Sequence, residues 1–227
     1  MIYASNVLAA SSETWSHRAG ERTLQGRLLG ESDLPALIGL HHRVLAALPD
    51  GILNAETDEF FAQHVFESGR LLGVETGDGE IVAYAVLGLP TASSSYNFGR
   101  DINLPLSELG AVAHLDGIGV DAAWRGHGLQ RALSQRRTAI AVAAGRRHMI
   151  TTVAPNNLHS LSNLLALGFN VVATRPMFAA SHIRHLLHLD ASKPTVAPAP
   201  ELQKTDPLAR PSLLAAFGPS ALSGDAA

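Results

Sequence analysis

Residues 111–133 read AVAHLDGIGVDAAWRGHGLQRAL, and the rest of the architecture can be built outward from them. Ala111 to Val120 alternates in the manner of a β-strand, whereas Leu129 to Ala144 repeats apolar residues at helical spacing. Met149 to Val153 follows as a short run of β-favouring residues. The stretch therefore predicts a strand, a tight turn, a helix and a second strand in succession.

The turn between that strand and helix, Arg125 to Gln130, carries glycine at positions 126 and 128. Glycine lets backbone N–H groups turn inward and approach an anion, and a helix N-terminus adds partial positive charge. These features predict a cradle for a pyrophosphate. Ordinary strand-to-helix connections also use such glycines, so that alternative stays open. The turn lacks the Lys-Ser/Thr of a P-loop, which argues against a nucleoside triphosphatase.

The flanking sequence predicts further strands and helices. Strands are expected at 23–29, 71–75, 81–87, 169–173 and 183–189, and helices at 34–48, 58–67 and 158–167. Asp-Gly within residues 76–79 indicates a hairpin between the second and third of these strands. The irregular segment 90–109 is long for a connection, and such loops are often functional. This order predicts an α/β protein with a mixed sheet.

Both ends of the chain lack clear periodicity and are predicted to be tails, over residues 1–21 and 191–227, the second rich in Pro and Ala and weakly ordered. With 46% hydrophobic residues, the 227-residue chain can bury a core as one domain over 22–190. The longest apolar stretches are too short to span a bilayer, and the N-terminus lacks the pattern of a secretory signal. These features, with zero cysteines, favour a cytoplasmic protein that does not bind membranes.

Charge and histidine placement bear on partners and metals. The net charge of −3 and the scattered basic residues argue against nucleic-acid binding. Zero cysteines exclude structural zinc held by thiolates. His41 and His42 would point apart on a helix, and His182, His185 and His188 would not share one strand face. No metal is predicted.

Two motifs in register resemble those of the GNAT family of N-acyltransferases. HLDGIGVDAAWRGHGLQRAL is similar to the acetyl-CoA motif, in which Arg/Gln-x-x-Gly-x-Gly/Ala follows a strand and begins a helix. Downstream, NLHSLSNLLALGF is similar to the second signature, with Asn157, Ser160, Gly168 and Phe169 in register. The resemblance covers residues 23–190 and is specific from about 111 to 170.

The resemblance implies a central mixed sheet of about six to seven strands flanked by helices. It also implies acetyl-CoA as co-substrate, with the pantetheine arm along the strand and the pyrophosphate on the glycine turn. The residues expected to contact acetyl-CoA are Ile118, Gly119, Val120, Arg125, Gly126, His127, Gly128, Leu129, Gln130, Asn157 and Ser160. Five further arginines surround the same unit: Arg131, Arg136, Arg137, Arg146 and Arg147. Some are candidates to meet the cofactor's phosphates, and most are expected on a solvated helix face.

Two positions depart from the family pattern. Gln130 stands where the motif has a small residue, but its backbone N–H can still donate, so cofactor binding is expected to survive. Leu164 stands where many members place the Tyr that protonates the departing thiolate. A thiol with a pKa near ~8.5 leaves tolerably without full protonation, which leaves water or Ser160 as the proton donor.

The strand carries the candidate general base for direct attack of an amine on the thioester. His114-Leu115-Asp116 resembles the His-x-His of aralkylamine N-acetyltransferases. Strand periodicity is expected to place His114, Asp116, Ile118 and Val120 on one face. His114 and Asp116 are the predicted base pair. The alternative is that His114 is a satisfied buried residue and Asp116 caps a neighbouring backbone group.

The predicted activity is transfer of an acetyl or other acyl group to the primary amine of a small molecule, amino acid or peptide. In the family the acceptor lies between two segments that are 49–54 and 90–109 here, where Tyr84, Tyr96 and Phe98 are candidate lining residues. One alternative is a non-catalytic acyl-CoA-binding sensor on the same fold. Another is a protein-lysine or aminoacyl-tRNA acetyltransferase, which would need a wide groove. A homodimer is one assembly to test.

Overall fold

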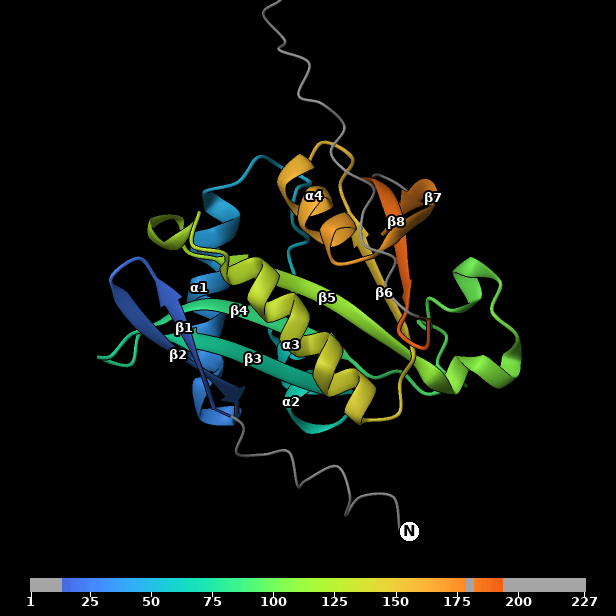
Figure 1. Cartoon of the computed structure of the whole chain (residues 1–227), viewed down its shortest axis with the longest axis horizontal. Coiled ribbons are helices and arrows are strands. Elements are labelled where there is room, and N and C mark those ends of the chain that lie inside the picture. Colours follow the sequence, from blue (N-terminus) through green and yellow to red (C-terminus); the bar gives the residue numbers. More distant parts are fainter. Residues whose placement is uncertain (1–13, 179–181, 194–227) are drawn as a thin grey trace, which may run out of the picture. The chain divides into compact units, whose positions relative to one another are not determined.

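The computed structural model describes residues 14–178 and 182–193, which form a mixed sheet between two layers of helices (Figure 1). The strands are β1 Trp15–Ala19, β2 Arg22–Leu29, β3 Gly69–Glu75, β4 Ile81–Gly88, β5 Val112–Val120, β6 His148–Val153, β7 Asn170–Met177 and β8 His182–Asp190. Among the described residues they form an eight-stranded sheet in the order β1-β2-β3-β4-β5-β6-β8-β7. The β5–β6 pair is parallel and the other neighbouring strands are antiparallel. The α/β prediction is confirmed, with one strand more than the predicted range.

Helices cover both faces of the sheet. The α-helices are α1 Leu34–Ala46, α2 Asp58–Phe66, α3 Leu129–Ala143 and α4 Leu158–Ala166, and short 3₁₀ turns lie at Glu31–Asp33, Arg100–Ile102, Leu106–Ala111 and Ala122–Trp124. Residues of α1 and α2 share one core cluster, whereas α3 and α4 contribute to a second cluster on the opposite face. The predicted helices and strands therefore form at the expected places.

Strand β1 corrects the predicted N-terminal tail, because residues 15–19 pair with β2 through a hairpin closed at Gly20 and Glu21. Gly20 has a φ of +62°, which glycine adopts at little cost. Trp15 lies over Gly26 so closely that a Cβ there would be 2.0 Å from the indole. A short strand beside Ser and Gly gives a weak periodic signal, which explains the error. The predicted C-terminal tail falls outside the described residues from 194 onward.

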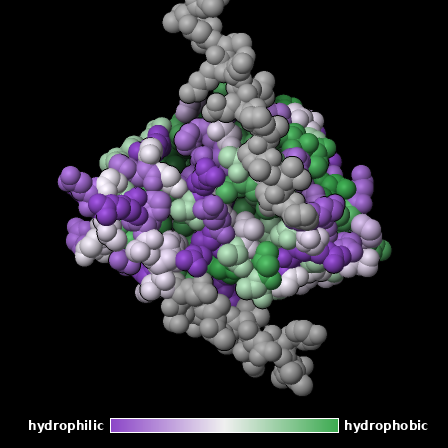
Figure 2. All heavy atoms as spheres, viewed as in Figure 1, coloured by the Kyte–Doolittle hydropathy of each residue, from purple (hydrophilic) through white to green (hydrophobic). Residues whose placement is uncertain are grey.

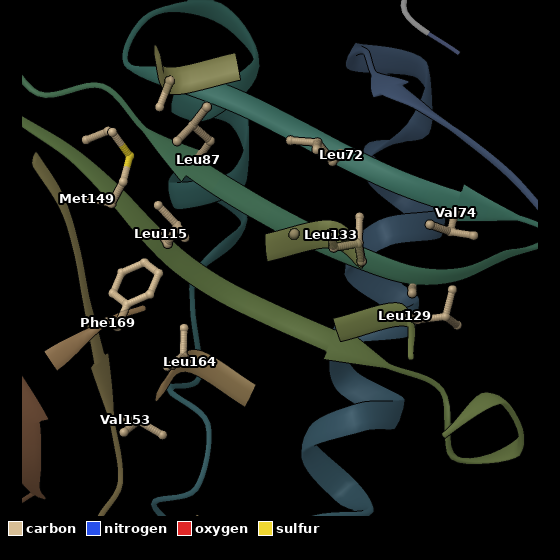
Figure 3. Packing of buried hydrophobic residues seen from close by; sticks show 14 of the residues in the cluster. Leu72, Val74, Leu87, Leu115, Leu129, Leu133, Met149, Val153, Leu164 and Phe169 are labelled. Atoms are coloured by element: carbon tan, nitrogen blue, oxygen red, sulfur yellow. The ribbon is translucent and has the colours of Figure 1, made fainter. Parts of the chain in front are cut away.

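The main core cluster lies between the sheet and helices α3 and α4 (Figure 3). Leu87 and Leu115, on paired strands β4 and β5, meet Leu133 of α3 and Leu164 of α4 there. All four side chains are at most 5% exposed. Burying each leucine is worth roughly 1.5–3 kcal/mol, so this cluster holds α3 and α4 against β5.

Strand β5 carries one extra residue relative to β4. Ala85 pairs with Ile118 and Leu87 with Leu115, so Asp116 and Gly117 together oppose Val86 in a β-bulge. Arg137 of α3 stabilises this bulge: its Nη1 donates to the carbonyl oxygens of Val86 at 2.8 Å and Asp116 at 2.9 Å. Arg137 is only 2% exposed, so it is not on the solvated helix face that the sequence predicted.

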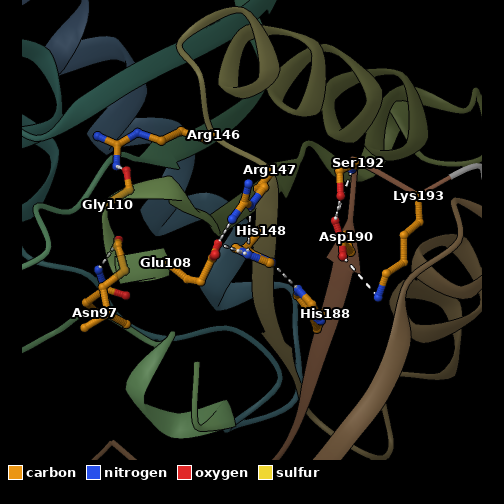
Figure 4. A network of polar contacts seen from close by, with 11 residues as sticks. Asn97, Glu108, Gly110, Arg146, Arg147, His148, His188, Asp190, Ser192 and Lys193 are labelled. Carbon is orange, nitrogen blue, oxygen red and sulfur yellow. Dashed lines mark hydrogen bonds and ion pairs between the residues drawn. The ribbon is translucent and has the colours of Figure 1, made fainter. Parts of the chain in front are cut away.

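The long segment before β5 is held by arginines and a histidine pair (Figure 4). Arg146 donates to the carbonyl oxygens of Pro90 and Gly110, and Arg147 pairs with Glu108. Glu108 Oε2 also lies 3.1 Å from His148 Nε2, and His148 Nδ1 lies 3.0 Å from His188 Nε2. Arg146 and Arg147 therefore anchor this segment to the start of β6.

Exposed apolar side chains gather at the outer edge of the sheet. Val171 and Val172 of β7 are 42% and 46% exposed. Figure 2 shows a hydrophobic, green area at the upper right of the molecule, on the side where Figure 1 places β7. Homodimer formation stays a prediction.

Among the described residues, none of the helices combines the length and apolar character needed to cross a bilayer.

Replacing Arg137 tests whether its guanidinium stabilises the bulge. We expect Arg137→Met to lower the free energy of unfolding by about 3 kcal/mol, because two buried carbonyl groups lose their donor. Urea denaturation measures the change. Arg131 is exposed on the same helix, and Arg131→Met should change stability by less than about 0.5 kcal/mol. Equal effects of the two substitutions would contradict this role for Arg137.

Candidate functional site

The candidate site opens where β5 and β6 diverge. Their parallel pairing covers only Val112–His114 opposite His148–Ile150. Beyond it, Thr151 Oγ1 donates to the carbonyl oxygen of Leu115 at 2.6 Å, and the two strands separate. A cavity of about 1210 Å³ occupies the opening and extends from the α1–α2 loop to the glycine turn. One continuous cavity therefore connects the two ends of the predicted site.

The glycine turn has the backbone geometry of an anion cradle. Gly126 and Gly128 have φ values of +84° and +75°, and a Cβ on Gly126 would meet nothing within 4 Å. Gly128 is the N-cap of α3, whose first turn carries no acidic residue. His17 of β1 donates from Nε2 to the carbonyl oxygen of His127 at 2.7 Å, and this hydrogen bond holds the turn to β1. Free N–H groups and the helix dipole can thus act on an anion.

Most residues predicted to contact acetyl-CoA line this cavity. They are Ile118, Gly119, Val120, Arg125, Gly126, Gly128, Leu129, Gln130, Asn157 and Ser160. His127 instead borders a separate cavity of about 470 Å³, together with Trp124 and Arg22. The structure therefore gathers residues from both sequence motifs at one opening, whereas His127 borders the other cavity.

Side chains of α3 and α4 are joined across this opening. Gln130 Nε2 donates to Ser160 Oγ at 2.8 Å, and Asn163 Nδ2 donates to Gln130 Oε1 at 2.8 Å. Asn157 caps α4 by accepting from the Ser160 N–H at 3.1 Å. The departure from a small residue at position 130 thus adds a bridge between the two helices.

The bulge overturns the prediction that four residues of β5 share one face. Ile118 and Val120 pack with the cluster under α3, whereas Asp116 faces His64 of α2 on the other side of the sheet. One extra residue in β5 reverses the two-residue alternation. Gly119 faces Tyr84, since a Cβ there would lie 2.3 Å from the tyrosine ring.

The end of the cavity near the α1–α2 loop, where the sequence predicts the acceptor and which is therefore called the acceptor end, holds an acidic and imidazole cluster. His64 Nε2 lies 3.7 Å from Asp116 Oδ2, and both residues line the cavity with Glu56. Gly88 makes room for the carboxylate of Asp116, because a Cβ there would lie 2.6 Å from Oδ2. Burial and the charge of Asp116 raise the pKa of Glu56 above its ordinary value.

The protonation of His64 follows from its two contacts. Its Nδ1 lies 2.7 Å from the carbonyl oxygen of Phe60, so Nδ1 carries a proton and Nε2 faces Asp116 with its lone pair or a second proton. Burial opposes the charged imidazolium, but contacts with Asp116 and Phe60 and the charge of Glu56 outweigh it and raise the pKa of His64. His64 Nε2 is therefore suited to accept a proton near neutral pH.

Asp116 keeps its negative charge in this cluster. Burial favours its neutral form, but His64, His114 and Arg137 outweigh this effect and lower the pKa of Asp116. An ionised carboxylate beside His64 stabilises the imidazolium that a proton transfer would form. The Arg137 contact with the carbonyl of the same residue fixes its backbone.

His114 lines the cavity but is engaged by the long segment before β5. Its Nε2 accepts from the Phe98 N–H at 3.0 Å, and its ring stacks on Phe98 at 4.3 Å between centroids. Burial lowers the pKa of His114. Its role as a base stays a hypothesis, and the hydrogen bond occupies the lone pair that a base would need.

Sequence reasoning missed His64, Glu56 and Arg184, which all line the acceptor end. His64 follows Phe61 by three residues, and these two are the buried side chains of α2. A histidine on the apolar stripe of a helix was the signal that could have identified it. Of the predicted aromatic lining, Tyr96 and Phe98 line the cavity, whereas Tyr84 is buried and its hydroxyl lies 2.6 Å from His41 Nδ1.

No group of three or more His, Asp or Glu side chains among residues 14–178 and 182–193 is arranged to hold a metal ion.

The chain matches one protein-family model, and its fold is similar to that of solved structures. The model of the acetyltransferase (GNAT) family matches residues 40–169, and no curated protein matches the chain. The ribosomal-protein-S18-alanine N-acetyltransferase from Escherichia coli superposes with a TM-score of 0.56 at 20% identity, over 75% of this chain and 96% of that one. The yncA protein from Salmonella typhimurium, solved with its cofactor acetyl-CoA, gives 0.55 at 21% identity over 78% and 98%. A GCN5-related N-acetyltransferase from Kribbella flavida gives 0.54 at 24% identity over 74% and 97%.

Removing the charge of Asp116 should change the titration of His64. In Asp116→Asn we expect the pKa of His64 to fall, because the imidazolium loses the negative charge of Asp116. NMR titration of the ring carbons measures this value. Asp58→Asn removes a charge at the exposed start of the same helix and should leave the pKa of His64 unchanged. An unchanged value in both variants would contradict the coupling.

Proposed function

This chain belongs to the GNAT family of acetyltransferases, and we propose that it transfers an acetyl group from acetyl-CoA to a primary amine by direct attack. One observation carries the proposal: a single cavity joins the glycine turn at α3 to the His64–Asp116 pair. The acceptor is a small molecule, amino acid or peptide. We also propose that the protein works in the cytoplasm.

In this proposal the glycine turn holds the pyrophosphate of acetyl-CoA. The N–H groups at the start of α3 donate to the phosphate oxygens, and Arg125 adds positive charge at the same end. The pantetheine arm runs along the edge of β5 that β6 leaves unpaired after His114. One backbone N–H among Ile118, Gly119 and Val120, on the edge of β5 that faces away from β4, then polarises the thioester carbonyl.

The amine is activated by His64. The amine nitrogen attacks the thioester carbon, and the carbon–sulfur bond breaks. His64 Nε2 takes the proton that the amine loses. Asp116 stabilises the resulting imidazolium. The departing thiolate is protonated by water or by Ser160, since Leu164 occupies the position of the family tyrosine and has no proton to give.

His114 with Asp116 is the alternative base pair, since both residues also line the cavity. It would require His114 to release the Phe98 N–H before accepting a proton. His64 needs no such rearrangement, because Nε2 makes no other hydrogen bond among the described residues. We therefore favour His64 and keep His114 as the residue that positions Phe98.

The second candidate function is a non-catalytic acyl-CoA-binding sensor, favoured by Leu164 in place of the family tyrosine. The two functions differ in turnover. Calorimetric titration with acetyl-CoA followed by a thiol-release assay over amines separates them. Amine-dependent release supports the enzyme; binding without release over the whole panel supports the sensor; absence of binding contradicts both.

Substitution of the cradle glycine should weaken acetyl-CoA binding selectively. Gly126→Ala and Gly145→Ala each place a Cβ at a positive φ, +84° and +76°, in open space. Both should cost about 1 kcal/mol of stability. We expect only Gly126→Ala to raise the Kd for acetyl-CoA, by at least about 10-fold, because its Cβ strains the turn that is proposed to present backbone N–H groups to the pyrophosphate, whereas Gly145 lies beyond the opposite end of α3. Calorimetry measures the Kd for acetyl-CoA in each variant. An equal loss of affinity in both variants would contradict the cradle.

Two variants separate His64 from His114 as the base. We expect His64→Gln to reduce kcat by about 10²- to 10⁴-fold. His114→Gln keeps an acceptor for the Phe98 N–H and should reduce kcat by less than about 10-fold. The reverse order would restore the His114 assignment.

The pH dependence of kcat/KM gives an independent test. The base must be neutral, so activity is present above the pKa of His64 and is lost as pH falls through it. Asp116→Asn should move this acidic limb to lower pH, because the pKa of His64 falls. Rate measurements between about pH 5 and 9 would locate the limb. A limb that moves to higher pH would exclude His64 as its source.

A further inference from the structure

Arg184 of β8 is a buried cation at the acceptor end of the cavity. It is 3% exposed and lines the cavity with Glu56, His64 and Asp116. Its Nη1 donates to the carbonyl oxygen of Ile52 at 3.2 Å, and its Nη2 donates to Asn54 Oδ1 at 2.7 Å. The guanidinium therefore reaches from the last strand to the loop between α1 and α2.

The hydrogen bonding of this guanidinium is incomplete. These two contacts use two of its five N–H groups, and the buried Nε has no hydrogen-bond partner in the described part of the chain. Buried polar groups are nearly always paired, and an unpaired charged donor costs more than a neutral one. The open donors point to a missing acceptor.

The charge of Arg184 is also incompletely balanced. Its pKa is lowered by burial, an effect that the charge of Glu56 opposes. Within residues 14–178 and 182–193, no carboxylate oxygen lies within salt-bridge distance of it. Arg137 is the other buried arginine whose Nε has no hydrogen-bond partner among the described residues. Its surroundings differ from those of Arg184, because its guanidinium donates to the carbonyl oxygens of Val86 and Asp116. A guanidinium fork matches a carboxylate, which accepts two parallel hydrogen bonds.

The opposite charge lies in the same cavity. Asp116 is ionised beside His64, so this side of the cavity attracts an ammonium group. A small molecule that carries both a carboxylate and an amine would satisfy Arg184 on one side of the cavity and Asp116 on the other. A peptide N-terminus has an amide where a free amino acid has its carboxylate, and an amide cannot balance a buried guanidinium.

We propose that the acceptor is a free amino acid, with its carboxylate held by Arg184 and its amine directed toward His64 and Asp116. This proposal rests on the proposed acetyl transfer and names its substrate class. Arg184 is then the residue that determines specificity, because it separates amino acids from simple amines and from peptides.

The test compares each of the common amino acids with its carboxamide. Thiol release from acetyl-CoA gives kcat/KM for both forms with the full-length protein. We expect the best amino acid to exceed its carboxamide by about 10- to 100-fold, the range for a hydrogen bond between charged groups. Equal rates for the acid and the carboxamide would overturn the proposal and leave acetyl transfer intact.

Variants of Arg184 test whether the preference for the acid over the carboxamide depends on this guanidinium. Arg184→Gln should bring the acid-to-carboxamide ratio close to one, and Arg184→Lys should restore part of it. Asn54→Ala removes one contact of the guanidinium and leaves its charge, so the ratio should persist even if the rate falls. Because the ratio compares two substrates on one variant, general damage to the loop cancels. A ratio that persists in Arg184→Gln would overturn the assignment.

Binding of reaction products tests the carboxylate site without turnover. Calorimetry compares N-acetylated amino acids with their carboxamides on the wild-type protein and on Arg184→Gln. We expect the wild-type protein to bind the acids about 10-fold more tightly and the variant to bind both forms equally. This result in the absence of amine-dependent thiol release would contradict the enzyme and retain the anion site. Equal binding on the wild-type protein would overturn that site.

Discussion

The hydrogen bonds from Arg137 to the carbonyl oxygens of Val86 and Asp116 are the contacts on which the candidate site depends. They stabilise an extra residue in β5, and that residue reverses which face each following side chain occupies. Asp116 therefore faces α2 and the proposed acceptor end of the cavity, while Ile118 and Val120 face α3. Without the bulge, strand periodicity would place these side chains on one face, and the carboxylate would not be separated from the cofactor side.

The divergence of β5 and β6 is the second constraint. Because their pairing stops at His114 and Ile150, the sheet opens along its centre without losing the core on either side. The opening places the N-terminus of α3 at one end and charged side chains of α2, β5 and β8 at the other. Two carboxylates, two histidines and Arg184 share this low-dielectric space, so each protonation state depends on its neighbours.

Periodicity was informative for elements whose residues act close together along the chain. The strand-turn-helix unit formed as predicted because Gly126, Gly128 and the apolar residues of α3 act locally. Helix α4 also formed at its predicted place, and Asn157 caps it by accepting from the Ser160 N–H three residues later. Strand β1 was missed because five residues beside Ser and Gly form a strand only when β2 pairs with them. His64 was missed because helical spacing indicates which face of α2 it occupies but not its partner Asp116 on β5.

The sequence by itself determined the family, the mixed α/β fold and the glycine turn, because these depend on residues close together along the chain and on their spacing. Only the tertiary structure decided which charged groups meet. Asp116, His64 and Arg184 come from β5, α2 and β8, and a one-residue bulge held by a buried arginine sets the orientation of Asp116. Contacts between segments that are distant in sequence leave no periodic signal in any one of them, so folding alone brings this cluster together.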